Sequence, residues 1–248
     1  MQPLKTILAA GMFAAASVTA FGQSEPVDHF SKVIVSPYIQ VTFVQGEKES
    51  VTINDIMVDS NKLHIEVQDG TLRLYLDGAK DIPHNQHVYN GDGSKRSFPL
   101  YHNHTVVATV TYKTLDALSL RGEETHVCQS PLSAGEFTLR VYGESKVIFD
   151  EVHIGEMHTT MYGEGSLDIK AGSVDEQYYT CYGEGKINTT AIKSQESKIT
   201  AFGEAEFRLN VSDRIKITAF GEAKLRYIGN PEIVKGIHLG GLDLAKID

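Results

Sequence analysis

Residues 161–165, Met-Tyr-Gly-Glu-Gly, are one copy of a short motif that returns along the second half of the chain. The glycines of its copies are Gly122, Gly143, Gly163, Gly183, Gly203 and Gly221. Successive glycines are 21, 20, 20, 20 and 18 residues apart. Self-similarity at a fixed period is the signature of a repeat architecture, so the motif predicts a solenoid.

Between the glycines the residues alternate with a period of two, which is the pattern of a β-strand. Apolar residues precede each glycine by two and four positions, as Val141 and Leu139 do, and follow it by four and six, as Val147 and Phe149 do. Such short strands cannot bury an apolar face alone, so successive repeats must stack. The repeat predicts an all-β solenoid with coils of about 20 residues, most regular over residues 113–230.

Each glycine is expected at a corner, where a positive φ or the close approach of the next coil leaves no room for a Cβ atom. The residues two positions later are small, which fits the same crowded bend. They are Ser145, Gly165, Gly185, Ala205 and Ala223.

The glutamates after the glycines should form a column of carboxylates along the solenoid. They are Glu144, Glu164, Glu184, Glu204 and Glu222, with Glu123 ahead of them. Neighbours about 4.8 Å apart repel by about 0.9 kcal/mol in water, so the column must be solvated, neutralised or bound to cations. One interpretation is a solvated edge, partly neutralised by Lys146, Lys186 and Lys224; the other is calcium, which takes carboxylate oxygens as ligands.

The aromatic residues before the glycines face outward if the alternation holds up to the corner, next to Thr160, Thr180, Thr200 and Thr218. These aromatics are Tyr142, Tyr162, Tyr182, Phe202 and Phe220. Stacked rings beside hydroxyls and carboxylates can hold a sugar chain or a peptide edge, so the five aromatics and the five glutamates from Glu144 to Glu222 are candidate ligand-binding residues. The alternative is a ring stack that only covers the corner.

Residues 1–22 are expected to be a secretory signal peptide. Lys5 precedes an apolar run from Ile7 to Val18, and the small residues Ala20 and Gly22 follow. The run is too short and too interrupted by glycine for a stable membrane span. We therefore expect export to the periplasm, the outer cell surface or the extracellular space, and no integral membrane protein.

The rest of the chain, residues 23–248, is expected to form one domain. The net charge is −9, and an acidic surface disfavours nucleic acids and anionic membranes as partners. Cys128 and Cys181 can pair only if their Cα atoms lie within about 7 Å. Two buried free thiols are the favoured interpretation.

The first half is also predicted to form short strands, over residues 30–35, 39–44, 50–53, 63–67 and 71–76. Asp69-Gly70 between the last two is a tight-turn dipeptide. At the other end of the chain, residues 239–244, Leu-Gly-Gly-Leu-Asp-Leu, are expected to cap the solenoid.

The chain resembles the head GIN domain family, the putative autotransporter adhesins of Gram-negative envelopes. The resemblance is carried by FSKVIVSPYIQVTFVQGEKESVTI (30–53), LHIEVQDGTLRLYL (63–76), VVATVTYKTLDALSLRGEETHV (106–127), the glycine-turn coils and GNPEIVKGIHLGG (229–241). It implies a single-stranded, right-handed parallel β-helix-like solenoid in one exported domain with no established enzymatic role. This chain departs from the family's small-residue turn by carrying Gly-Glu at the corners.

A second departure is a polar insertion at residues 79–104, which contains His84, His87, His102 and His104. The spacings His-x-x-His and His-x-His can place imidazoles on one zinc ion, so these histidines are a candidate metal site. The favoured interpretation is a polar hairpin around Gly-Asp-Gly-Ser, with no cofactor.

The leading functional hypothesis is an exported, non-catalytic binding or structural module of the cell envelope, such as an adhesin. The sequence does not name a partner; an envelope or extracellular glycan or protein is compatible with this hypothesis, and so is an oligomer. The alternatives are a carbohydrate-active β-helix enzyme and a periplasmic envelope-stress accessory. A column of equivalent glutamates disfavours the enzyme, because acid–base catalysis needs two groups in different environments.

Overall fold

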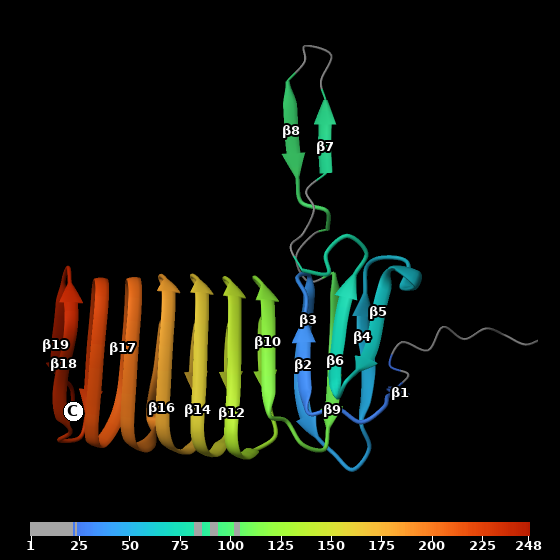
Figure 1. Ribbon diagram of the computed structural model, residues 1–248. Helices are drawn as coiled ribbons and strands as arrows, with labels where there is room; N and C mark the ends of the chain where they lie inside the picture. The colour runs from blue at the N-terminus through green and yellow to red at the C-terminus, as the bar shows by residue number, and fades with distance from the viewer. Residues whose placement is uncertain (1–21, 23, 82–85, 90–93, 102–104) are drawn as a thin grey trace, which may run out of the picture.

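The computed structural model describes residues 22, 24–81, 86–89, 94–101 and 105–248. Seventeen strands form one hydrogen-bonded sheet wound into a β-solenoid, whose coils lie side by side in Figure 1. Two further strands, β7 (Gln86–Tyr89) and β8 (Lys95–Phe98), form a separate antiparallel pair. Within the described residues, the helical structure is limited to the short 3-10 turn η1 (Ser60–Lys62). The predicted all-β solenoid is confirmed.

The regular coils stack strand over strand in two parallel columns. The first column contains β10 (Ala117–Gly122), β12 (Leu132–Gly143), β14 (Val152–Gly163) and β16 (Gly172–Gly183). The second contains β11 (Thr125–Cys128), β13 (Lys146–Phe149) and β15 (Ser166–Ile169). The long strand β17 (Lys186–Ile228) and then β18 (Glu232–Leu239) and β19 (Leu242–Lys246) continue both columns. The register advances by one repeat per coil, so that Tyr142 pairs with Tyr162 and Tyr162 with Tyr182.

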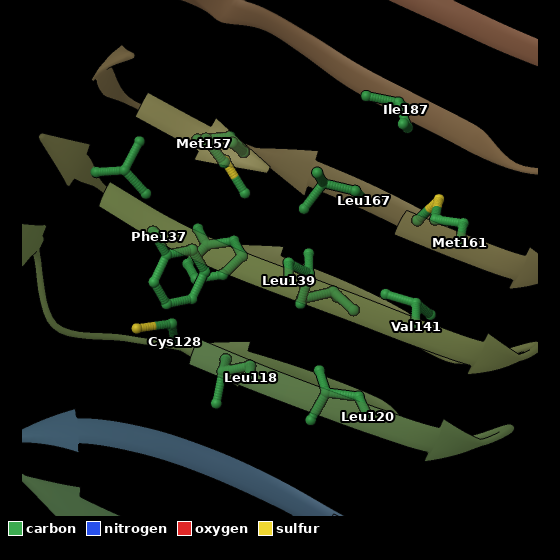
Figure 2. Packing of buried hydrophobic residues seen from close by; sticks show 14 of the residues in the cluster. Leu118, Leu120, Cys128, Phe137, Leu139, Val141, Met157, Met161, Leu167 and Ile187 are labelled. Carbon is green, nitrogen blue, oxygen red and sulfur yellow. The ribbon is translucent and has the colours of Figure 1, made fainter. Parts of the chain in front are cut away.

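The core lies inside the coils and is built from the positions that the alternation predicts. Leu139 and Val141 from β12 point inward together with Leu167 from β15 (Figure 2). Phe137 packs edge-to-face on Phe149 at 5.8 Å between ring centroids. Both cysteines are buried and free, as expected. Burial raises the pKa of the Cys128 thiol to about 11 and that of Cys181 to about 12, so both thiols are poor nucleophiles.

The glycine corners are closed by backbone contact between coils. Gly163 has a φ of 112°, and a Cβ atom built on it would lie 2.6 Å from the carbonyl oxygen of Gly143. The same oxygen accepts a hydrogen bond of 3.0 Å from the N–H of Glu164. Glycine is therefore required here both by the backbone angle and by the distance to the preceding coil.

The first half of the chain extends the two columns and then ends them. Strands β2 (Lys32–Val35) and β3 (Ile39–Gln45) pair in parallel with β10 and β11, and β6 (Thr71–Leu76) and β9 (Val106–Tyr112) add one more parallel layer. Strands β4 (Ser50–Ile56) and β5 (Leu63–Gln68) pair antiparallel with β9 and β6, and β1 (Ser24–Pro26) pairs antiparallel with β4. The parallel coils are thus bordered at this end by antiparallel strands.

The polar insertion leaves the solenoid at a corner. In each regular coil the Gly-Glu step joins the first column to the second, and the connection from β6 to β9 occupies the equivalent place. The intervening coil turns there at Pro37 and Tyr38, where Tyr38 has a φ of 72°. The insertion and the Gly-Glu steps therefore belong to one line of corners.

Residues 239–244 form a further corner and lie in the terminal coil of the described solenoid, so their role as a cap stays a prediction. Gly240 has a φ of 118°, and β19 behind it pairs in parallel with β17. Leu242 and Leu244 pack against the core as the earlier coils do. The solenoid extends to Lys246, beyond the residues 113–230 in which the sequence repeat is most regular.

One histidine lies wholly within the core. His126 in β11 is 1% exposed, neighbours Val147 in register, and has no hydrogen-bond partner on either ring nitrogen among the described residues. Burial lowers its pKa to about 3, because the protonated ring would lose its hydration without gaining a partner.

Replacing a corner glycine should destabilise the fold far more than replacing a glycine with free space around it. For Gly163→Ala we expect the melting temperature to fall by roughly 3 to 10 °C, from the cost of the left-handed backbone and the contact with Gly143. Gly135→Ala is the matched control, since nothing lies within 4 Å of a Cβ atom there and its φ is not positive. Equal melting temperatures for the two variants would contradict this account of the corner.

His126 should make the folded state sensitive to acid. Between pH 6.5 and about 3 the unfolded chain binds a proton at this ring that the folded chain does not, so folding free energy is lost as the pH falls. In thermal melts at pH 7.5 and pH 5.0, His126→Val should lose less stability on acidification than the natural chain. The exposed His238→Gln is the control and should behave as the natural chain does.

Candidate functional site

Five aromatic rings form an outward stack along the solenoid, which we call the aromatic ladder. Its members are Tyr142, Tyr162, Tyr182, Phe202 and Phe220. Successive ring centroids are 5.1, 4.9, 4.9 and 5.1 Å apart, with planes within 7° of parallel. The three central rings are 41, 40 and 37% exposed. The expected outward orientation is therefore what the structure shows.

The stacking decides which part of each ring meets a partner. Because each ring covers the faces of its neighbours, the ladder presents ring edges and, at its tyrosines, phenol hydroxyls. Ring edges carry partial positive charge, whereas ring faces carry partial negative charge. The first ring, Tyr142, has the guanidinium of Arg121 over it, 5.4 Å from the ring centroid. A sugar on this ladder would meet edges and hydroxyls rather than lie flat on a ring.

The ladder is one of several columns on the same outward surface, which we call the ladder face. In β12 the residues that follow one another on this face are Glu136, Thr138, Arg140 and Tyr142. The predicted threonine column, Thr160, Thr180, Thr200 and Thr218, lies half-buried beside the rings. Hydroxyl groups, which both donate and accept hydrogen bonds, thus run parallel to the aromatic edges.

The corner glutamates, Glu144, Glu164, Glu184, Glu204 and Glu222, are all exposed and border the ladder on the corner side. Among the described residues no ion pair joins them to Lys146, Lys186 or Lys224. Lys186 and Lys224 nevertheless line the same surface hollow as Glu184, Glu204 and Glu222, so partial neutralisation by these lysines stays a prediction. The described residues also contain no group of three or more His, Cys, Asp or Glu side chains arranged to hold a metal ion.

Sequence reasoning missed a second acidic column on the other border of the ladder face. It consists of Glu136, Glu156, Glu176 and Glu196, which pair with one another in register. The signal was present, because each lies seven residues before a repeat glycine. Glu156 is within 2.6 Å of His158, and Glu176 accepts a hydrogen bond of 2.6 Å from Tyr178, whose pKa it raises to about 12.

At its N-terminal end the ladder opens into a hollow of about 650 Å³, which we call the junction hollow. Three successive corners line it, those at Pro37 and Tyr38, at Gly122 and Glu123, and at Gly143 and Glu144. The lining also includes Asp81 near the start of the polar insertion, Arg121, Glu124, and the first ring of the ladder, Tyr142. Sequence reasoning did not find this site, since its parts come from four separate segments.

Buried and paired charges hold the junction hollow in shape. Glu124 is 1% exposed and accepts hydrogen bonds from the backbone N–H groups of Tyr38, at 3.1 Å, and Glu123, at 3.0 Å. It occupies the position that small residues hold in the later coils. Asp81 pairs at 2.5 Å with both Arg121 and Arg73, and these two guanidinium groups lower the pKa of its carboxyl.

The predicted zinc site cannot be placed. His84, His102 and His104 lie outside the described residues, and His87 is described only as a backbone position in β7, opposite Ser97. The signal peptide of residues 1–22 likewise lies almost wholly outside the described part of the chain. Both remain predictions.

Comparison with family models gives a match over residues 29–231 to the family described as putative auto-transporter adhesin, head GIN domain. The chain belongs to this head GIN domain family. The resemblance seen in the sequence is thus confirmed over most of the chain. A search of curated proteins gave no match. Within the described residues of this GIN domain chain, no helix has the length and apolar character needed to cross a membrane.

Several solved structures share the fold. A putative adhesin from Bacteroides fragilis has a TM-score of 0.74 at 17% identity, covering 91% of this chain and 96% of its own. A putative adhesin from Parabacteroides merdae has a TM-score of 0.66 at 16% identity, covering 92% and 95%. A putative lipid binding protein from Parabacteroides distasonis has a TM-score of 0.65 at 16% identity, covering 93% and 98%. At these identities the likeness shows the fold alone.

The two acidic columns predict that salt stabilises the protein. Raising NaCl from 0.01 to 1 M shortens the screening length from about 30 to about 3 Å, below the spacing of neighbouring coils, and should raise the melting temperature by several degrees. The double variant Glu164→Gln/Glu184→Gln should melt higher at low salt and respond less to added salt. Calcium at constant ionic strength should add no further shift if the column is only solvated.

The control for this measurement is Glu25→Gln/Glu47→Gln, which removes the same charge from exposed positions outside both columns. A salt response that is equal in the two double variants would show that overall charge, and not the columns, sets the effect. A separate rise in melting temperature with millimolar calcium would favour the cation-bound interpretation of the corner glutamates.

Proposed function

We propose that this chain is an exported, non-catalytic binding module of the bacterial cell envelope, and that it binds an extended neutral glycan along its ladder face. The observation that carries the proposal is the exposed aromatic ladder. Leu239 pairs with Phe220 in register, so the apolar line continues into β18. Four of the large hydrophobic side chains that are exposed in the described residues belong to this line: Tyr162, Tyr182, Phe202 and Leu239. A contiguous exposed apolar line with a polar rim is typical of an interaction site.

The chemistry of the surroundings favours a hydroxyl-rich partner. Threonine hydroxyls run beside the rings, and carboxylates border the face on both sides, where they can accept hydrogen bonds from sugar hydroxyls. The same carboxylates repel phosphate and other anionic groups, which argues against nucleic acid and anionic lipid surfaces. Repetition of these groups from coil to coil supports a polymer that lies along the solenoid axis.

Several features support binding rather than catalysis. The corner glutamates recur in the same surroundings, whereas paired catalytic carboxylates need different environments. The family and the similar structures carry the name adhesin, and one similar structure is named as a lipid binding protein. The net charge of −9 and the acidic borders make a neutral glycan a better partner for this chain than an anionic lipid.

The test is retention on immobilised neutral polysaccharides in a glycan array. The double variant Tyr162→Ala/Tyr182→Ala removes the two central rings and should weaken retention about tenfold or more, as the loss of central contact residues does at other interfaces. Phe98→Ala is the control, because this exposed ring lies in β8 and away from the ladder. Circular dichroism should show that all variants keep their β-structure.

Two results would overturn the proposal. One is a natural chain that binds none of the neutral glycans on the array. The other is a double variant that is retained as well as the natural chain, which would leave the ladder as a cover for the corner.

A further inference from the structure

We infer that the junction hollow is a subsite for the terminal sugar of the glycan, where the chain holds one neutral, polyhydroxylated ring. This inference rests on the proposed function, because it assigns one end of the same glycan to one end of the ladder. The hollow, of about 650 Å³, falls within the size range of small-molecule sites and is much larger than one sugar ring needs, so neighbouring residues of the chain can leave it along the ladder.

The position of the hollow connects it to the ladder. Arg121 pairs in register with Tyr142, so it occupies the place that an aromatic ring occupies in each later coil. Its guanidinium covers the outer face of Tyr142 and ends the stack. A ligand that follows the ring edges toward the N-terminal end therefore reaches Arg121 and the hollow next.

The charged groups of the hollow are suited to hydroxyl groups. Arg121 and Asp81 form a pair there, Glu123 and the buried Glu124 add two carboxylates, and the Glu144 carboxylate has no hydrogen-bond or ion-pair partner among the described residues. An anionic ligand would meet this excess of carboxylates, and a small cation would offer no acceptor to the guanidinium of Arg121. A hydroxyl group donates to a carboxylate and accepts from a guanidinium, so a ring with several hydroxyls satisfies both at once.

The walls are held before a ligand arrives. The buried Glu124 carboxylate ties the Tyr38 corner to the Glu123 corner through two backbone N–H groups. Tyr38 in turn packs edge-to-face on Tyr101 at 5.6 Å between ring centroids. Asp81 fixes Arg121, which has little freedom left to lose. Such pre-organisation lowers the entropy cost of binding.

The matched variants are Glu144→Ala and Glu47→Ala. Both remove one exposed glutamate, but Glu47 lies neither in the hollow nor on the ladder face. In NMR titrations of the full chain with methyl glycosides of neutral hexoses and with neutral trisaccharides, we expect shifts in the Arg121 side-chain and Tyr142 ring signals. Glu144→Ala should weaken this binding about tenfold, Glu47→Ala less than about twofold, and Glu144→Gln, which keeps an acceptor oxygen, should restore most of it.

The inference is overturned if none of the neutral sugars shifts these signals, if Glu144→Ala and Glu47→Ala bind alike, or if glucuronate or glycinamide binds better than the neutral sugars. Its failure is distinguishable from that of the proposed function. If retention on the array depends on Tyr162 and Tyr182 but no sugar shifts the Arg121 and Tyr142 signals, only the subsite is refuted. Sugar binding in the hollow with retention unaffected by those two tyrosines refutes the ladder as a binding surface.

Discussion

The contact between the backbones of adjacent coils at the glycine corner is the constraint on which the rest of the structure depends. The carbonyl oxygen of one corner glycine receives the N–H of the glutamate in the next coil, and it lies where a side chain on the next glycine would have to be. This contact keeps the equivalent residues of successive coils opposite one another. Because the register is kept, a residue type repeated in the sequence becomes a straight column on the surface. The aromatic ladder and the acidic borders are consequences of the corner.

Much of the fold follows from the sequence for this reason. The period of the glycines gave the coil length, and the alternation between them assigned Leu139 and Val141 to the core and Tyr162 to the surface, as the structure shows. The antiparallel strands β4 and β5 were harder to foresee, because a short alternating strand looks the same whichever direction its neighbour runs. Gly240 has the same positive φ as the earlier corner glycines, so the repeat geometry continues into the segment that the sequence predicts to be a cap.

The candidate site was predictable only where it repeats. The ladder and the corner glutamates could be read from one motif, whereas the column that begins at Glu136 was missed because it lies outside that motif. The junction hollow had no signal of its own. Tyr38, Asp81 and Arg121 meet there through the stacking of coils and the exit of the insertion, and no local pattern encodes that meeting. Glu124 stands where later coils have small residues, and only its neighbours Tyr38 and Glu123 explain it.

The stacked coils also determine how the surface can change in size. Each coil contributes one ring, one hydroxyl or its equivalent and two border residues, so valency toward a polymer grows in equal steps with solenoid length. A ligand with a repeat near the coil spacing would meet each step in the same way, and one with a different repeat would drift out of phase. The number of coils therefore sets the length of polymer that the ladder can contact.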